Sequence, residues 1–193
     1  MEEIKLIEQA KLGNRKSLEE LVKKYESTVY NFSFKICRDK NRAENTMQET
    51  FLSMIKNIKQ FKGDSKLSTW LYTVVSNHCL MLARTESKHA YTSFEDKDAS
   101  IDEKKFTDWN AAPDKVTEDK ELKNLLDDSI EKLQPDYRVV FLLRDVEGFS
   151  TEETAKMCNL SIPAVKSRLH RARAFLRKEL NKKFNYEKTW NNL

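Results

Sequence analysis

A strip of polar and basic side chains near the C-terminus has the composition that recognition of bases and phosphates requires. Between positions 161 and 183 the sequence holds eight Lys or Arg and a single Glu, a net charge of +7. Apolar residues recur here every three or four positions, which predicts a helix with one buried face: Val165, Leu169, Ala172, Leu176 and Leu180. The opposite face and its flanks hold the candidate binding residues Lys166, Ser167, Arg168, His170, Arg171 and Arg173. Such a face suits the major groove of duplex DNA, with short polar groups near base edges and cations near phosphates.

A shorter helix is predicted directly before this one. Ser150 is a good N-cap, and Glu153 three residues later completes a capping box. Asn159 ends the helix, since Asn tolerates the left-handed conformation that a helix exit needs, and Ser161 then caps the next helix. A basic helix that is merely solvated remains the alternative interpretation. Two helices joined by a tight turn favour a helix-turn-helix DNA-binding unit over it.

The composition of the 193-residue chain predicts one large or two small helical domains. Only three Gly and three Pro occur, while 34% of the residues are charged. The N-terminus has neither a basic segment nor an apolar one, and no apolar stretch is long enough to cross a bilayer, so neither secretion nor membrane insertion is expected. Cys37, Cys79 and Cys158 are widely spaced and form no CxxC motif. They favour a reduced, cytoplasmic protein with small buried thiols.

The first ninety residues predict four helices, at about positions 4–12, 16–38, 42–61 and 67–84. The third has an apolar stripe on one side and a polar face on the other. That polar face holds or adjoins Glu44, Asn45, Gln48, Glu49, Leu52 and Lys56. Leu52 is the one apolar residue among them. It is either a contact for a partner or an ordinary exposed leucine.

A loop at positions 61–66, with its Gly and Asp, precedes the fourth helix. The inward side of that helix is predicted to hold Leu67, Leu71, Val74, His78 and Leu82. Trp70, close to the basic loop, has two possible roles. It can stack on unpaired bases, or it can complete the core.

Several stretches resemble a known family of transcription factors. AENTMQETF and FKGDSKLSTWLYTVVSNHC resemble conserved region 2 of extracytoplasmic-function (ECF) sigma factors, a branch of the sigma-70 superfamily. LQPDYRVVFLLRDVEGFSTEETAKMCNLSIPAVKSRLHRARAFL resembles their region 4. The resemblance covers about positions 6–180 apart from the middle of the chain. Local departures are Asn45 and Met81, where the family often has Asp, Thr154, where it often has Ile, and Asn159, where Gly is common.

The resemblance implies an all-α protein of two small helical domains. Region 2 would occupy residues 1–90, a flexible linker 91–118, region 4 residues 119–185, and a tail 186–193. The stretch 85–121 contains eleven Asp or Glu and six Lys or Arg, a net charge of −5, which by itself predicts a mobile acidic linker.

The resemblance also implies partners and a role for each candidate residue. The β′ clamp coiled coil of RNA polymerase core would contact Glu44, Gln48, Glu49 and Leu52, and the β flap is a second expected contact on polymerase. The melted −10 element of promoter DNA would contact Phe61, Lys62, Gly63, Asp64, Ser65, Lys66, Trp70 and Asn77. The duplex −35 element would contact Lys166, Ser167, Arg168, His170, Arg171 and Arg173. An anti-sigma factor is a further expected partner. The expected location is the cytoplasm, at the nucleoid when the protein is active, or at the membrane when the anti-sigma factor holds it there.

Two further arginines and two other classes of protein are alternatives that the sequence offers. Arg138 and Arg144, upstream of the helix-turn-helix, are further candidates for phosphate contact. An autonomous helix-turn-helix regulator, acting without polymerase, would explain the C-terminal motif but not the first ninety residues. An enzyme is disfavoured because the sequence contains no nucleophile with a base, no phosphate-binding Gly loop and no clustered metal ligands. We therefore expect no catalytic residue, no metal and no cofactor.

Overall fold

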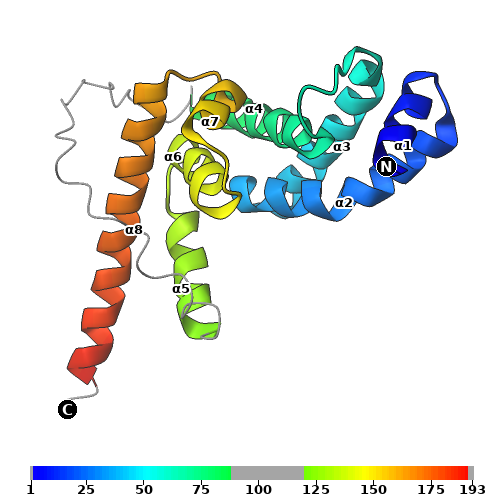
Figure 1. Ribbon diagram of the computed structural model, residues 1–193. Helices are drawn as coiled ribbons and strands as arrows, with labels where there is room; N and C mark the ends of the chain where they lie inside the picture. Colours follow the sequence, from blue (N-terminus) through cyan, green and yellow to red (C-terminus); the bar gives the residue numbers. More distant parts are fainter. Residues whose placement is uncertain (1, 88–119, 191–193) are drawn as a thin grey trace.

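The computed structural model describes residues 2–87 and 120–190, and every regular element within these two ranges is a helix (Figure 1). The first half, residues 2–87, contains α1 (Glu2–Lys11), α2 (Arg15–Cys37), α3 (Lys40–Asn57), a 3-10 turn (Ile58–Gln60) and α4 (Leu67–Ser87). The second half, residues 120–190, contains α5 (Lys120–Glu131), α6 (Pro135–Phe141), a π-helical turn (Leu142–Val146), α7 (Thr151–Cys158) and α8 (Ile162–Trp190). The predicted all-α fold is thereby confirmed. The linker predicted at 91–118 lies outside the described residues.

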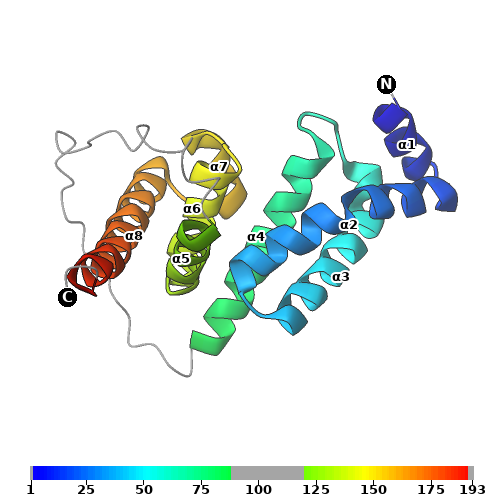
Figure 2. The same cartoon turned by 90° about the horizontal axis from the view of Figure 1, so that it is seen from below.

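Helices α2, α3 and α4 form a bundle, and α1 packs against the N-terminal part of α2 at one end of it (Figures 1 and 2). Helix α2 contributes a buried stripe at spacings of three and four: Leu21, Tyr25, Val29, Phe32 and Ile36. Helix α2 is followed by the C-cap residue Arg38, whose left-handed φ of 54° turns the chain. Asp39 then caps α3 by accepting a hydrogen bond from the Arg42 N–H. The tight connection sets α3 alongside α2.

The inward side of α4 differs from the prediction. Leu67 and Leu71 are buried as expected, but the next buried apolar positions are Val75, Cys79 and Leu80. The predicted Val74, His78 and Leu82 are only half-buried. Helix α4 packs against α2 and α3 on one side and against α6 and α7 on another. A helix that is buried on two sides has no single apolar stripe, so the sequence period alone misplaces its inward face.

The two halves meet where α4 and the end of α2 contact α6, α7 and the turn before α7 (Figure 2). The ring of Tyr72 on α4 lies edge-on to Phe32, with centroids 4.4 Å apart, and to Phe149 of the second half, at 5.5 Å. The Tyr72 hydroxyl donates a 2.8 Å hydrogen bond to Glu147, which also lies 3.3 Å from the ammonium of Lys35. Aromatic packing and one shared carboxylate thus join the halves.

Arg138 of α6 donates four hydrogen bonds to backbone carbonyls, one of them across the interface between the halves. Its guanidinium is buried, with the residue only 7% exposed. Within the second half it donates to the carbonyls of Ile130, Glu131 and Leu133, at the end of α5 and just beyond it, and across the interface it donates to the carbonyl of Ile36, at 2.6 Å. The last carbonyls of a helix have no partner within the helix, and one guanidinium satisfies such groups on two helices here.

The expectation that Arg138 contacts phosphate is wrong, because its guanidinium is buried. Arg138 is occupied by the four carbonyls, and Arg144 donates to the carbonyl of Phe149 in the turn that leads into α7. Both arginines support the backbone of the second half. The sequence could not reveal this role, because the position of an arginine in the helical pattern does not tell whether its side chain is buried or exposed.

Replacement of Arg138 by methionine should destabilise the protein strongly. Arg138→Met leaves the α5 and α2 carbonyls without donors while it retains much of the side-chain volume, so we expect the free energy of unfolding to fall by about 3 kcal/mol. Urea denaturation followed by circular dichroism measures the loss. Arg15→Met, at an exposed position of α2, is the matched control and should change the value by less than about 0.5 kcal/mol. Equal stability of the two variants would contradict the assigned role.

Candidate nucleic-acid interface

Local capping builds the helix-turn-helix of α7 and α8 as the sequence predicts. The Glu153 N–H donates to Ser150 Oγ at 3.1 Å, and the Ser150 N–H donates to the Glu153 carboxylate at 2.7 Å, which lowers the pKa of that carboxyl group. Asn159 adopts φ 52° and ψ 51° at the end of α7. Ser161 Oγ then accepts from the Ala164 N–H at 3.3 Å in the first turn of α8. The predicted capping box and left-handed exit are confirmed.

The apolar stripe of α8 is buried at Val165, Leu169, Ala172 and Leu176, where the helix packs on α6. This orientation turns the opposite strip outward. Lys166 and His170 are exposed there, whereas Ser167 and Arg171 are half-buried. One guanidinium nitrogen of Arg171 donates to the hydroxyl of Tyr137 at 3.3 Å, so the stem of this side chain is positioned by α6.

Two other predicted DNA contacts, Arg168 and Arg173, form ion pairs inside the second half. Arg173 donates to both carboxylate oxygens of Asp145, at 2.8 and 2.7 Å, which raises the pKa of its guanidinium. Arg168 lies 3.4 Å from the carboxylate of Asp136. These carboxylates hold the flanks of α8 onto α6 and the π-helical turn. Neither partner was expected from the sequence, because both lie about thirty residues away along the chain.

The predicted −10 loop surrounds a hollow at the free end of the bundle. Lys62, Gly63, Asp64, Ser65 and Lys66 are exposed, and Phe61 is half-buried against the core. Gly63 has a φ of 82°, which an L side chain rarely adopts. The hollow has a volume of about 970 Å³ and is closed on its other side by residues of α1, among them Glu3, Ile4, Ile7 and Lys11. No residue of α1 was among the predicted −10 contacts.

The two remaining residues predicted at the −10 element lie on α4. Trp70 is half-buried and packs against the core. Of its two possible roles, stacking on bases or completing the core, this contact matches the second. Asn77 lies about two turns further along the helix and is exposed. The predicted −10 residues therefore follow one another from the loop onto the outer side of α4.

The outer face of α3 presents the residues predicted to contact polymerase. Gln48, Glu49 and Leu52 are exposed, and Glu44 is half-buried with an ion pair of 3.9 Å to Lys40. Ile55, one turn after Leu52, is also 46% exposed, so two apolar side chains rather than one interrupt the polar face. Ile55 was not predicted as part of this face, although its spacing of three from Leu52 places the two residues on the same side of a helix.

A hollow of about 360 Å³ adjoins this face. It lies between α3 and α2 and is lined by Glu26, Ser27, Tyr30, Glu44, Met47 and Gln48. Its α2 residues were not among the predicted contacts. The surface around Glu44 and Gln48 is therefore concave and acidic on two sides.

The predicted residues thus form three separate groups rather than a single site. Helices α3 and α8 lie on opposite sides of the molecule in both views, and the loop before α4 lies at the end of the bundle beside α1 (Figures 1 and 2). Among the residues that the structure describes, no three His, Cys, Asp or Glu side chains are arranged to hold a metal ion. Within those same ranges, no helix is both long and apolar enough to cross a membrane.

A capped helix-turn-helix with a basic outer strip, joined to a helical bundle with an exposed glycine-containing loop, defines a DNA-binding protein of two helical modules. Residues 21–89 match the family description "Sigma-70 region 2", and residues 123–176 match "Sigma-70, region 4". CarQ of Myxococcus xanthus, an RNA polymerase sigma factor, is 31% identical over 173 residues, which are 87% of this chain and 91% of CarQ. SigW of Bacillus subtilis, an ECF RNA polymerase sigma factor, is 28% identical over 178 residues, 91% of this chain and 95% of SigW. The chain therefore belongs to the sigma-70 family, among the ECF RNA polymerase sigma factors.

Solved structures share the fold. The sigma factor RpoE in complex with the anti-sigma factor NepR, from Bartonella quintana, aligns with a TM-score of 0.60 at 20% identity, over 86% of this chain and 98% of that one. CnrH in complex with the cytosolic domain of CnrY aligns with a TM-score of 0.57 at 21% identity, over 92% and 96%. The helical bundle of the first half corresponds to region 2, and the segment from α5 to α8 corresponds to region 4.

Proposed function

We propose that this ECF sigma factor holds core RNA polymerase with the outer face of α3, recognises a −35 element with α8 and opens a −10 element with the loop before α4. The observation that carries this proposal is the separation of the three groups of residues. Each lies on its own exposed surface, and each belongs to a segment that matches region 2 or region 4. Polymerase and two DNA elements can therefore be bound at the same time.

At the −35 element, the outward strip of α8 enters the major groove of duplex DNA. Lys166 and Arg171 are the groups that form specific hydrogen bonds to guanine, since a bidentate cation contact discriminates a base pair by about 1–3 kcal/mol. His170 and Ser167 lie beside them on the same strip. Arg168 and Arg173, in their ion pairs with Asp136 and Asp145, fix the angle of α8 and meet phosphate only at its flanks.

At the −10 element, the hollow beside the loop receives a base from the melted non-template strand. Extrusion of a base costs a few kcal/mol, which stacking and hydrogen bonds in a pocket must offset. Phe61 supplies an apolar ring at the hollow, and Lys62 and Lys66 supply cations for the strand backbone. The half-buried Trp70 and the exposed Asn77 continue the contact along α4.

On polymerase, the β′ clamp coiled coil is the proposed partner of the α3 face. Leu52 and Ile55 supply an apolar centre, and Glu44, Gln48 and Glu49 supply a polar, acidic surround, the usual anatomy of a protein interface. The β flap is the proposed contact of region 4, on the family resemblance alone.

An anti-sigma factor is the proposed regulator, because both aligned solved structures are complexes, and the RpoE partner is an anti-sigma factor. The protein would then act in the cytoplasm at the nucleoid, and it would be held at the membrane where the regulator is a membrane protein. An autonomous helix-turn-helix regulator is disfavoured, because it leaves the match of residues 21–89 to region 2 without a role.

Transcription with purified components tests the proposal as a whole. Core polymerase mixed with this protein and fragmented genomic DNA should produce transcripts whose 5′ ends share a −35 and a −10 sequence upstream. Sequencing of those 5′ ends measures the outcome, with core polymerase alone as the control. If the protein neither binds core polymerase nor directs promoter-specific transcripts, the proposal fails.

Substitution of Arg171 should weaken recognition of the −35 element. For Arg171→Ala we expect affinity of the holoenzyme for promoter DNA to fall by roughly 5- to 150-fold at fixed salt, the loss of one bidentate base contact. Fluorescence anisotropy with labelled promoter DNA measures the change. Arg15→Ala, an arginine at the exposed start of α2, should leave affinity unchanged. An unaltered affinity for Arg171→Ala, with the fold intact, would remove Arg171 from the interface.

Charge reversal on α3 should weaken the contact with polymerase. Glu49→Lys places a cation beside the exposed Leu52, and we expect holoenzyme formation to weaken by at least about tenfold, as for a like-charge or mismatched contact at an interface. Glu19→Lys, an equally exposed charge reversal on α2, serves as the control. Native gel titration with core polymerase compares the two variants. Normal holoenzyme formation by Glu49→Lys would show that this face does not bind polymerase.

A further inference from the structure

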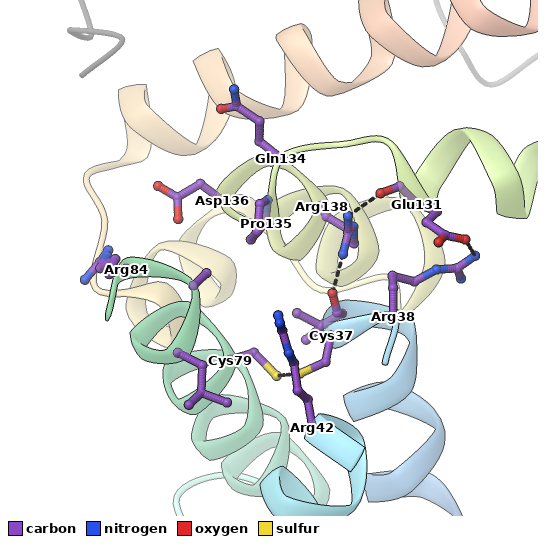
Figure 3. A pocket seen from close by; sticks show the side chains of 13 residues that line it. Cys37, Arg38, Arg42, Cys79, Arg84, Glu131, Gln134, Pro135, Asp136 and Arg138 are labelled. Atoms are coloured by element: carbon purple, nitrogen blue, oxygen red, sulfur yellow. Dashed lines mark hydrogen bonds and ion pairs between the residues drawn. The ribbon is translucent and has the colours of Figure 1, made fainter. Parts of the chain in front are cut away.

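Two cysteines that are far apart in the sequence lie side by side where regions 2 and 4 meet. Cys37 is the last residue of α2, and Cys79 lies in the middle of α4. Their sulfur atoms are 2.6 Å apart, closer than two unbonded sulfur atoms normally come, although both cysteines are free thiols (Figure 3). Both line a cavity of about 580 Å³ that opens between α2, α4 and the start of α6.

The surroundings of the pair make the two thiols unequal. Cys79 is buried, at 4% exposure, whereas Cys37 is half-buried at the cavity wall. The hydrogen bond between the sulfurs lowers the pKa of Cys37 and, together with burial, raises that of Cys79. Thr46 Oγ1 lies 3.7 Å from Cys37 Sγ and 3.8 Å from Cys79 Sγ and adds a second polar contact.

The cavity is also rich in cations. Arg38, Arg42, Arg84 and Arg138 line it, against Glu131 and Asp136 as the acidic residues (Figure 3). Positive charge near a thiol favours the thiolate, which is the nucleophilic form. Cys37 therefore combines access from solvent, a positive environment and a neighbouring thiol, the three features that distinguish a redox-sensitive cysteine from a structural one.

We propose that Cys37 and Cys79 form a redox-active dithiol, which a peroxide converts into an intramolecular disulfide that links α2 to α4.

In the first step, the Cys37 thiolate attacks one oxygen of hydrogen peroxide. An S–O bond forms, the O–O bond breaks, and the departing hydroxide takes up a proton to become water. In the second step, Cys79 Sγ attacks Cys37 Sγ, the S–S bond forms and the S–O bond breaks, and the departing hydroxide takes the Cys79 proton. Two thiols and one peroxide thus give one disulfide and two waters, with two electrons passing from sulfur to peroxide.

The disulfide forms at a place that contacts region 4. Cys37 lies between Ile36, whose carbonyl accepts from Arg138, and Arg38, whose guanidinium donates to the Asp127 carbonyl of α5 at 2.9 Å. A covalent bond at Cys37 therefore fastens to α4 the same turn of α2 that holds α5 and α6. The bond also closes the chain between positions 37 and 79, which restricts the unfolded state.

Cys158 provides a control within the same chain. It is buried in α7, where burial raises its pKa to about 12, and it has no cysteine beside it. A peroxide should therefore consume Cys37 at least about tenfold faster than Cys158.

The test uses the full, reduced protein alone, so its result does not depend on promoter or polymerase binding. After treatment with a small molar excess of hydrogen peroxide, free thiols are blocked by alkylation and the peptides are analysed by mass spectrometry. We expect a peptide pair joined through Cys37 and Cys79 that has lost two hydrogen atoms and that dithiothreitol separates. The oxidised protein should melt about 5–10 °C higher than the reduced protein.

Three variants sharpen the test. Cys158→Ser should form the same disulfide at the same rate, whereas in Cys79→Ser the sulfenic acid of Cys37 should persist and react with dimedone. If Cys79→Ser fails to fold, the peptide result for the unaltered protein and for Cys158→Ser still decides. Cys37→Ser should leave Cys79 and Cys158 almost unreacted. Full alkylation of Cys37 and Cys79 after peroxide, a disulfide that includes Cys158, or oxidation of Cys37 to sulfinic acid without a disulfide would each overturn the proposal.

Discussion

One buried cation, the guanidinium of Arg138, joins regions 2 and 4 by donating to backbone carbonyls of both. The last carbonyls of a helix carry partial negative charge and lack partners, and both α5 and α2 end where the Arg138 guanidinium lies. The rigid fork of this group donates to carbonyls of both helices at once, which a lysine ammonium could not do with the same geometry. Burial lowers the pKa of the guanidinium, yet arginine stays protonated in proteins, so the contact persists across the physiological pH range.

The surfaces proposed for polymerase and DNA lie away from this interface, and their local supports are separate from it. The strip on α8 is oriented by its own buried stripe, by the capping of α7 and by the Asp145–Arg173 pair. The face of α3 is oriented by the bundle of region 2. The DNA-binding surfaces proposed on the loop before α4 and on α8 are tethered, so they would reinforce each other, and the distance between the −10 and −35 elements would become part of the specificity.

Local features were predictable from the sequence, and long-range pairings were not. The capping box at Ser150 and the helix exit at Asn159 each depend on contacts with residues no more than four positions away. The bounds of the helix-turn-helix could therefore be predicted to single residues. Trp70, Arg138 and the inward side of α4 depend on which helices pack together, and a helical period does not contain that information. For the same reason the wide spacing of Cys37 and Cys79 predicted small buried thiols but not their contact, which the bundle creates.

The end of α2 is the point where these long-range pairings converge. Three consecutive residues reach three different elements: Ile36 accepts from α6, Cys37 contacts α4, and Arg38, in its left-handed conformation, donates to α5. A change in the contact of one of these residues therefore shifts the backbone turn that carries the other two. The outer strip of α8 and the outer face of α3 share none of the three contacts. The contacts of this turn with α6 and α5 join the two regions beside the cluster of Tyr72, Phe149 and Glu147. The surfaces proposed for DNA and polymerase are positioned by each module by itself.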